Sequence, residues 1–156
     1  MEIGAVSAGP DDALAIAALA DGAVDELRPH RGGEMWSRRE AREGPHTTAV
    51  ADLVSRDDAC VLTGTIDDSL VGYAIAIEAP LHDGARVADL TDLYVLPDAR
   101  GVGVGEALMI AVEEWAGERG CMGIDSIALP GDRETKNFFE SFGLVARALR
   151  VHRSIG

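Results

Sequence analysis

The chain has 156 residues, of which 47% are hydrophobic and 26% are charged, and its 27 acids against 14 bases give a formal net charge of −13. This balance fits one globular domain over residues 1–156 rather than a disordered chain, and the acidic field argues against a nucleic-acid partner. No apolar run approaches the roughly 20 residues of a membrane span, and no basic segment opens the chain as in a signal peptide. We therefore expect a cytoplasmic protein without a membrane partner. Cys60 and Cys121 lack metal-ligand spacing, so we expect no bound metal.

The first half of the chain alternates between strand and helix patterns. A proline and two acids after Gly9 suit a helix start, where backbone N–H groups are free and the dipole is positive. Two apolar runs joined by the acidic turn at 67–69 predict a β-hairpin. The expected elements are a strand at 2–7, a helix at about 11–27, an irregular or short-helical segment at 28–46, a helix at 47–56 and hairpin strands at 60–66 and 70–78.

The second half has clearer boundaries. An apolar stripe recurs at helical spacing from Val104 to Ala116, and Gly120 ends that helix. Asp132 is a suitable cap for a further helix that Gly143 stops, and the residues after it alternate as in a strand. The expected elements are a strand at 87–95, a glycine-rich turn at 100–105, a helix at 104–119, a strand at 124–129, a helix at 132–142 and a last strand at 144–152. This order indicates an α/β domain with a mixed sheet.

The glycine-rich turn is the strongest functional signal. A strand, glycines and a helix start together bind anions, because free N–H groups and the helix dipole point at the ligand and no Cβ blocks its approach. The chain has no Gly-Lys-Ser/Thr, which excludes a Walker loop. The dinucleotide fingerprint needs glycine at position 106 or 108, where the chain has Glu106 and Leu108. The pattern that fits is R-x-x-G-x-G, starting at Arg100.

Residues 92–105, DLYVLPDARGVGVG, resemble the acetyl-CoA-binding motif of the GNAT superfamily of N-acetyltransferases. Residues 137–144, NFFESFGL, are similar to the "FYE-LGF" segment of that family, and the resemblance extends over 87–153. It implies a central mixed, mostly antiparallel sheet of six to seven strands flanked by about four helices. It also implies acetyl-CoA as cosubstrate, bound by strand groups, by the turn and by two later side chains: Leu93, Tyr94, Val95, Arg100, Gly101, Val102, Gly103, Val104, Gly105, Asp132 and Phe139.

Acetyl transfer to an amine needs a base for the amine, a donor for the thioester oxygen and a proton for the departing thiolate. Asp89 occupies the strand position where some family members carry a catalytic glutamate, and Asp92 is a second candidate. For Asp89, a role as an arginine's partner stays open beside that of base. Strand alternation predicts Asp89 with Leu93 on one face and Asp92 with Tyr94 on the other. Phe139 replaces the tyrosine that commonly protonates the thiolate, so this chain lacks that donor.

The resemblance predicts an N-acetyltransferase that acts by direct transfer on an amine-bearing small molecule or peptide. The alternatives are an acyl-CoA sensor without turnover, which Phe139 favours, and a purely structural domain. The acidic field favours cationic acceptors, whereas an arginine cluster favours one with a carboxylate, and a homodimer stays open. The segment expected to form the acceptor wall contains His30, Trp36, His46 and that cluster, which comprises Arg28, Arg31, Arg38, Arg39 and Arg42.

Overall fold

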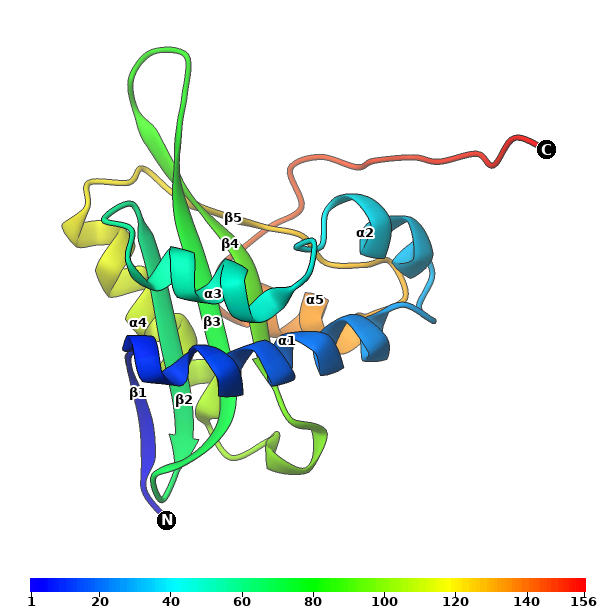
Figure 1. Ribbon diagram of the computed structural model, residues 1–156. Coiled ribbons are helices and arrows are strands. Elements are labelled where there is room, and N and C mark those ends of the chain that lie inside the picture. Colours follow the sequence, from blue (N-terminus) through cyan, green and yellow to red (C-terminus); the bar gives the residue numbers. More distant parts are fainter.

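The computed structural model describes residues 1–156 and contains one sheet with helices on both faces (Figure 1). The sheet has the order β1-β2-β3-β4-β5, antiparallel throughout except for the parallel pair β4–β5. The strands are β1 (Ile3–Ser7), β2 (Ala59–Ile66), β3 (Ser69–Pro80), β4 (Arg86–Val95) and β5 (Ile124–Ser126). The helices are α1 (Ala13–Leu27), α2 (Gly33–Arg39), α3 (His46–Val54), α4 (Val104–Glu118) and α5 (Arg133–Ser141), with short 3₁₀ turns at Pro10–Asp12 and Pro97–Ala99.

Two apolar clusters hold the helices to the sheet. On one face α1 and α3 pack on the strands through residues such as Ile16 and Val50, which meet Tyr73 and Ile75. On the other face α4 packs through the stripe that the sequence predicts. The buried members of that stripe are Val104, Leu108, Val112 and Ala116, and Met109, which is not part of the stripe, is buried beside them. The expected hairpin, the helix before it and the helix after the glycine turn are therefore confirmed. No helix is long and apolar enough to span a bilayer.

The expected count of six to seven strands is wrong, because the sheet has five, and five α-helices flank it instead of about four. The strand predicted at 124–129 ends at Ser126. The strand predicted at 144–152 does not form, and the end of the chain beyond Arg147 leads away from the body (Figure 1). Its alternating pattern is real, but no strand of this chain pairs with it, and a strand needs a partner for its backbone groups.

Candidate functional site

The glycine-rich turn leads from the end of β4 into the first turn of α4. Gly103 is the N-cap of α4 with φ of +111°, and Gly101 has φ of +85°, so both adopt a left-handed conformation that favours glycine. A Cβ added at Gly101 would meet no atom within 4 Å, so the turn leaves open space in front of its backbone. A turn of this shape at a helix start can cradle an anion, which is the role that the sequence predicts for it.

A cavity of about 540 Å³, which we call the turn cavity, opens beside this turn. The end of β4, the turn, the start of α4 and the start of α5 line it. Most of the predicted cofactor residues therefore lie together; Val102 and Gly103 do not line the cavity, and Phe139 is replaced there by Phe138. The predicted residues that do line it are Leu93, Tyr94, Val95, Arg100, Gly101, Val104, Gly105 and Asp132.

Two polar residues of the turn cavity already have partners within the chain. Arg100 donates from Nε to the Val95 carbonyl at 2.8 Å, and its Nη2 donates to both carboxylate oxygens of Glu26 at 2.9 and 3.0 Å. Its guanidinium lies over the Tyr94 ring, 5.4 Å from the centroid. Asp132 caps α5 by accepting from the Thr135 amide at 3.2 Å and from its hydroxyl at 2.6 Å. An anion bound here would therefore meet backbone N–H groups and the helix end first.

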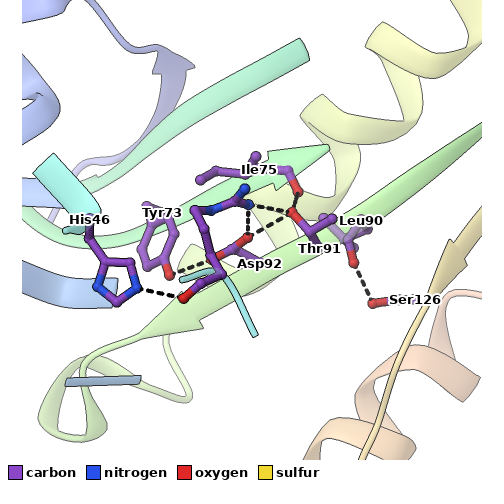
Figure 2. Close-up of polar contacts among 8 residues, drawn as sticks. His46, Tyr73, Ile75, Leu90, Thr91, Asp92 and Ser126 are labelled. Carbon is purple, nitrogen blue, oxygen red and sulfur yellow. Dashed lines mark hydrogen bonds and ion pairs between the residues drawn. The ribbon is translucent and has the colours of Figure 1, made fainter. Parts of the chain in front are cut away.

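A β-bulge in β4 determines to which face of the sheet the side chains of this strand point. Ile75 of β3 pairs with Asp92, but the next residue, Ala76, pairs with Leu90, so Thr91 is the extra residue. The single hydroxyl proton of Thr91 is shared between the Ile75 carbonyl, at 3.2 Å, and the Asp92 carboxylate, at 2.7 Å, and the contact with Ile75 secures the bulge (Figure 2). The predicted strict alternation along β4 is therefore wrong.

The consequence of the bulge is that two acids predicted on opposite faces share one face. Asp89 pairs in register with Ile77, and Asp92 with Ile75, and both isoleucines pack on the α1/α3 side. Leu93, which the alternation placed with Asp89, packs instead against the α4 cluster. The bulge thus directs both carboxylates to the same side of the sheet.

That side contains a cavity of about 270 Å³, which we call the strand cavity. It lies where β4 loses its neighbour: β5 pairs only with residues 88–90, so 91–95 have no strand partner on that edge. Ser126 secures the last paired position by donating to the Leu90 carbonyl at 2.8 Å (Figure 2). The strand cavity is lined by the acids Glu40, Asp89, Asp92, Asp125 and Asp132, and also by Arg42 and His46.

Asp89 is the carboxylate of this cavity without a partner: it makes no hydrogen bond or ion pair. Partial burial raises the pKa of Asp89 above its ordinary value, and the Asp125 carboxylate, its register partner on β5, raises it further. Arg147 acts in the opposite direction. It pairs bidentately with Asp125 and so lowers the pKa of that carboxyl. No arginine pairs with Asp89, so the alternative role of Asp89 as an arginine's partner is not found in the structure.

Asp92 is instead held by three donors (Figure 2). Tyr73 donates to Oδ2 at 2.9 Å, Thr91 to Oδ1 at 2.7 Å and Arg42 to Oδ1 at 2.6 Å. The Arg42 and Asp92 side chains are only 19% and 15% exposed, so this ion pair is shielded from solvent. Burial and the Asp92 charge raise the pKa of Tyr73, so its hydroxyl stays a donor. Asp92 thus fixes Arg42 in the cavity wall.

This network makes a stability prediction. Replacing Tyr73 with phenylalanine removes one donor from a buried carboxylate and should lower the free energy of unfolding by about 1.5–3 kcal/mol, measured by urea denaturation. Tyr94→Phe is the matched control, because its hydroxyl makes a longer bond of 3.2 Å to Glu26 at a more exposed position. Equal losses of unfolding free energy in the two variants would contradict the claim that the hydrogen bond from Tyr73 to the buried Asp92 carboxylate contributes more than an exposed one.

The segment before α3 forms the outer wall of the strand cavity. His46 links this segment to α1: its Nδ1 is bonded to Asp21 of α1, and its Nε2 lies 3.0 Å from the Arg42 carbonyl. Trp36 and His46 line the strand cavity, whereas His30 lines the turn cavity. Of the arginine cluster, only Arg42 lines either of these two cavities; Arg28 and Arg38 pair with acids one helical turn away.

The two cavities meet at the unpaired end of β4. They share Leu27, Leu93, Tyr94, Asp132 and Thr135, so a ligand in one can reach a ligand in the other along β4. An anion cradle on one side and a free carboxylate of raised pKa on the other suit the joining of an anionic carrier to a second, nucleophilic substrate.

Sequence reasoning missed three participants. For Asp125, the only signal in the sequence is that an acid stands at the start of the strand predicted at 124–129. Arg147 lies in the segment 144–152, which the sequence predicts to be a strand. Tyr73 is separated from Asp92 by 18 residues, and nothing in the sequence indicates the bulge that brings them together.

Known proteins are similar to this chain in sequence. The chain is 34% identical over 95 residues to an aminoglycoside N(6')-acetyltransferase type 1 of Klebsiella aerogenes, a match that covers 56% of this chain and 61% of that protein. It is 36% identical over 70 residues to an uncharacterized N-acetyltransferase of Archaeoglobus fulgidus, covering 43% of this chain and 47% of that one. The matches thus span about three fifths and about half of these relatives.

The fold agrees over the whole chain. The structure of AAC(6')-Iy in complex with a bisubstrate analogue, CoA-S-monomethyl-acetylneamine, superposes with a TM-score of 0.76 at 17% identity and covers 100% of this chain and 99% of that one. The model of the acetyltransferase (GNAT) family matches residues 22–144, which include α4, α5 and all of β2 to β5. Both β4 and the glycine turn lie within that match, and the chain therefore belongs to the acetyltransferase (GNAT) family.

Proposed function

We propose that this chain is an acetyl-CoA-dependent N-acetyltransferase that moves the acetyl group directly to the primary amine of a cationic small molecule or peptide. The observation that carries the proposal is the meeting of the two cavities at the unpaired end of β4. One cavity has the anion cradle that a pyrophosphate needs, and the other has an unpaired carboxylate of raised pKa. Acetyl-CoA would lie in the turn cavity, and the amine in the strand cavity.

The cofactor fits the turn cavity on three counts. Open space in front of Gly101 leaves room for phosphate oxygens to approach the amides of the turn. The edge of β4 from Leu93 to Val95 pairs with β3 on one side and has no strand on the other, so its free side can pair with the amide groups of the pantetheine arm. Val104 and Gly105, at the start of α4, add the positive end of the helix dipole.

Asp89 is the proposed base. It removes a proton from the ammonium of the acceptor, directly or through a water, and the neutral amine attacks the thioester carbonyl. A C–N bond forms and the C–S bond breaks. The nitrogen then loses its extra proton, which passes through solvent to the departing CoA thiolate, because Phe139 has no proton to give. Asp92 is satisfied by its three donors, and we assign it the positioning of Arg42 in the wall of the acceptor cavity.

The acceptor is proposed to be cationic, such as a polyamine, an aminoglycoside or a lysine-bearing peptide. Five acids line the strand cavity, and its arginine is neutralised by Asp92. The rest of the arginine cluster lines neither cavity, so it offers no anchor for a carboxylate there. The Klebsiella relative, named as an aminoglycoside acetyltransferase, supports the same class.

The charges around Asp89 make a prediction about pH. Because Asp125 raises the pKa of Asp89, Asp125→Asn should move the acid limb of the kcat profile to lower pH. Because Arg147 lowers it, Arg147→Gln should move the limb to higher pH. Steady-state rates from pH 4 to 8 with a saturating amine measure both shifts. Shifts of the same sign in the two variants would contradict the role of Asp89 as base.

Phe139 favours the second candidate function, an acyl-CoA sensor without turnover. Its ring is buried, lines the strand cavity and has no proton to give to the thiolate. We expect Phe139→Tyr to raise kcat or to shift the alkaline limb of its pH profile, because an unassisted thiol of pKa about 8.5 leaves more slowly than an assisted one. An unchanged kcat and an unchanged profile would show that loss of the donor does not limit the rate.

Thiol release separates the two candidates. Spermidine, an aminoglycoside and a lysine peptide should each be compared with glycine and glutamate as acceptors. We expect release of free CoA with the cationic amines and little with the two amino acids. CoA binding without release from any amine would support the sensor, and absence of CoA binding would refute both.

A further inference from the structure

Glu26 is an acid at a position where it does not stabilise its own helix. It lies in the last turn of α1, near the negative end of the helix dipole, and no base in that turn offsets its charge. Its carboxylate lines the turn cavity and pairs there with Arg100. An acid that is unfavourable for its helix and faces the proposed cofactor site indicates a role in that site.

The pair with Glu26 occupies part of the Arg100 guanidinium. Nε donates to the Val95 carbonyl at 2.8 Å and Nη2 donates to both Glu26 oxygens, whereas Nη1 makes no hydrogen bond. A guanidinium binds a phosphate most tightly through two parallel N–H donors on different nitrogens. Nη1 can provide one of them, but Nη2 can provide the other only after Glu26 has left it.

The charges of the turn cavity favour such an exchange. While Glu26 neutralises Arg100, acids dominate the cavity, and this field opposes the entry of a pyrophosphate. The Arg100 and Glu26 side chains are 35% and 33% exposed, and an ion pair so open to water is weak. A pyrophosphate, with more charge than one carboxylate, can therefore displace Glu26. The cavity is lined by the acids Glu26, Glu106, Asp132 and Glu134 and by the arginines Arg100 and Arg133.

A second partner keeps Glu26 close to Arg100 after the exchange. The Tyr94 hydroxyl donates to Glu26 Oε1 at 3.2 Å. Tyr94 and Leu27, the residue that follows Glu26, line both cavities. The displaced carboxylate therefore stays beside the junction of the cavities, from where it can return to Arg100.

We propose that Glu26 is an internal competitor of the cofactor: it neutralises Arg100 before acetyl-CoA binds, yields Nη2 to the pyrophosphate, and takes it back as CoA leaves. The exchange lowers the affinity for CoA and favours release of this product. The inference rests on the proposed place of acetyl-CoA in the turn cavity, and it adds a residue that regulates binding at that site.

Calorimetric titration with CoA gives the first test. We expect Glu26→Gln to bind CoA about fivefold more tightly than the wild type, the upper range for a partly exposed ion pair, because glutamine still accepts from Tyr94 but carries no competing charge. A lower affinity would show that Glu26 positions Arg100 for the phosphate, and it would overturn the proposal.

Asp25→Asn is the matched control for this titration. It removes the same charge from the preceding residue of α1, whose carboxylate pairs with Arg28 and lines neither cavity. We expect an unchanged affinity for CoA. An equal gain in the two variants would assign the effect to net charge and would overturn the exchange.

A double-mutant cycle with Arg100→Gln gives the second test. If Glu26 competes for Arg100, the gain in affinity from Glu26→Gln is larger with Arg100 present than in the Arg100→Gln background. A gain that is equal or larger without Arg100 would show only direct repulsion between Glu26 and CoA, and it would overturn the exchange.

Neither titration needs turnover, so the exchange and the acetyl transfer can fail separately. Tighter binding of CoA by Glu26→Gln, with no amine acetylated, would support the exchange and refute the transfer. Acetylation of an amine, with equal affinities for CoA in Glu26→Gln and the wild type, would overturn the exchange alone. Absence of CoA binding in every variant would overturn both.

Discussion

Replacing Asp89 with asparagine should lower kcat for acetyl transfer by about 10²–10⁴-fold, the usual contribution of a general base. The physical reason is that Asp89 is the carboxylate in the strand cavity without a donor or a counter-ion, and its pKa is raised toward the working range of a base. The affinity for CoA, measured by calorimetry, should change little, because Asp89 does not line the turn cavity.

Stability provides the control for this variant. A carboxyl whose pKa is raised by folding opposes folding once the pH exceeds its ordinary pKa. The Asp89→Asn variant should therefore be at least as stable as the wild type at neutral pH, and this advantage should vanish as the pH falls below about 4. A fully active Asp89→Asn variant would show that the base lies elsewhere, with Asp92 as the next candidate.

Replacing Gly101 with valine should weaken CoA binding by about tenfold or more, or 1.4 kcal/mol or more. The added side chain would occupy the open space in front of the turn, where phosphate oxygens approach the backbone amides. Calorimetric titration with CoA measures the loss.

Gly84→Val is the matched control for this experiment. Gly84 has φ of +89°, close to the +85° of Gly101, and its added Cβ would also meet nothing within 4 Å. It lies between β3 and β4 in the projecting hairpin (Figure 1) and lines neither cavity. Both variants carry the same backbone strain, so only Gly101→Val should lose affinity. Equal affinities in the two variants would show that the turn is not the phosphate site.

The sequence predicts the elements whose signals are local. Helical spacing of apolar residues locates α4, and the glycines before it locate the left-handed turn that leads into the helix, because both signals depend on neighbours in the chain. The hairpin of β2 and β3 follows in the same way from two apolar runs and an acidic turn.

What the sequence does not predict depends on pairing between distant segments. One extra residue at Thr91 reverses the alternation of β4, and its signal lies in the register with β3 rather than in any local pattern. That reversal brings Asp89 and Asp92 into one cavity and leaves Asp92, not Asp89, for Arg42. The strand predicted at 144–152 fails for a related reason, since its alternating pattern is present but no strand of the sheet pairs with it.

The central claim is that the two cavities are the two halves of one site, joined at Leu93 and Tyr94. Calorimetry with CoA and with a conjugate that links the CoA sulfur to spermidine through an acetyl bridge tests it most directly. We predict that the conjugate binds at least about tenfold more tightly than CoA, because its amine chain adds contacts with the acids of the strand cavity. A conjugate that binds no more tightly than CoA alone would contradict the claim that the strand cavity receives the acceptor.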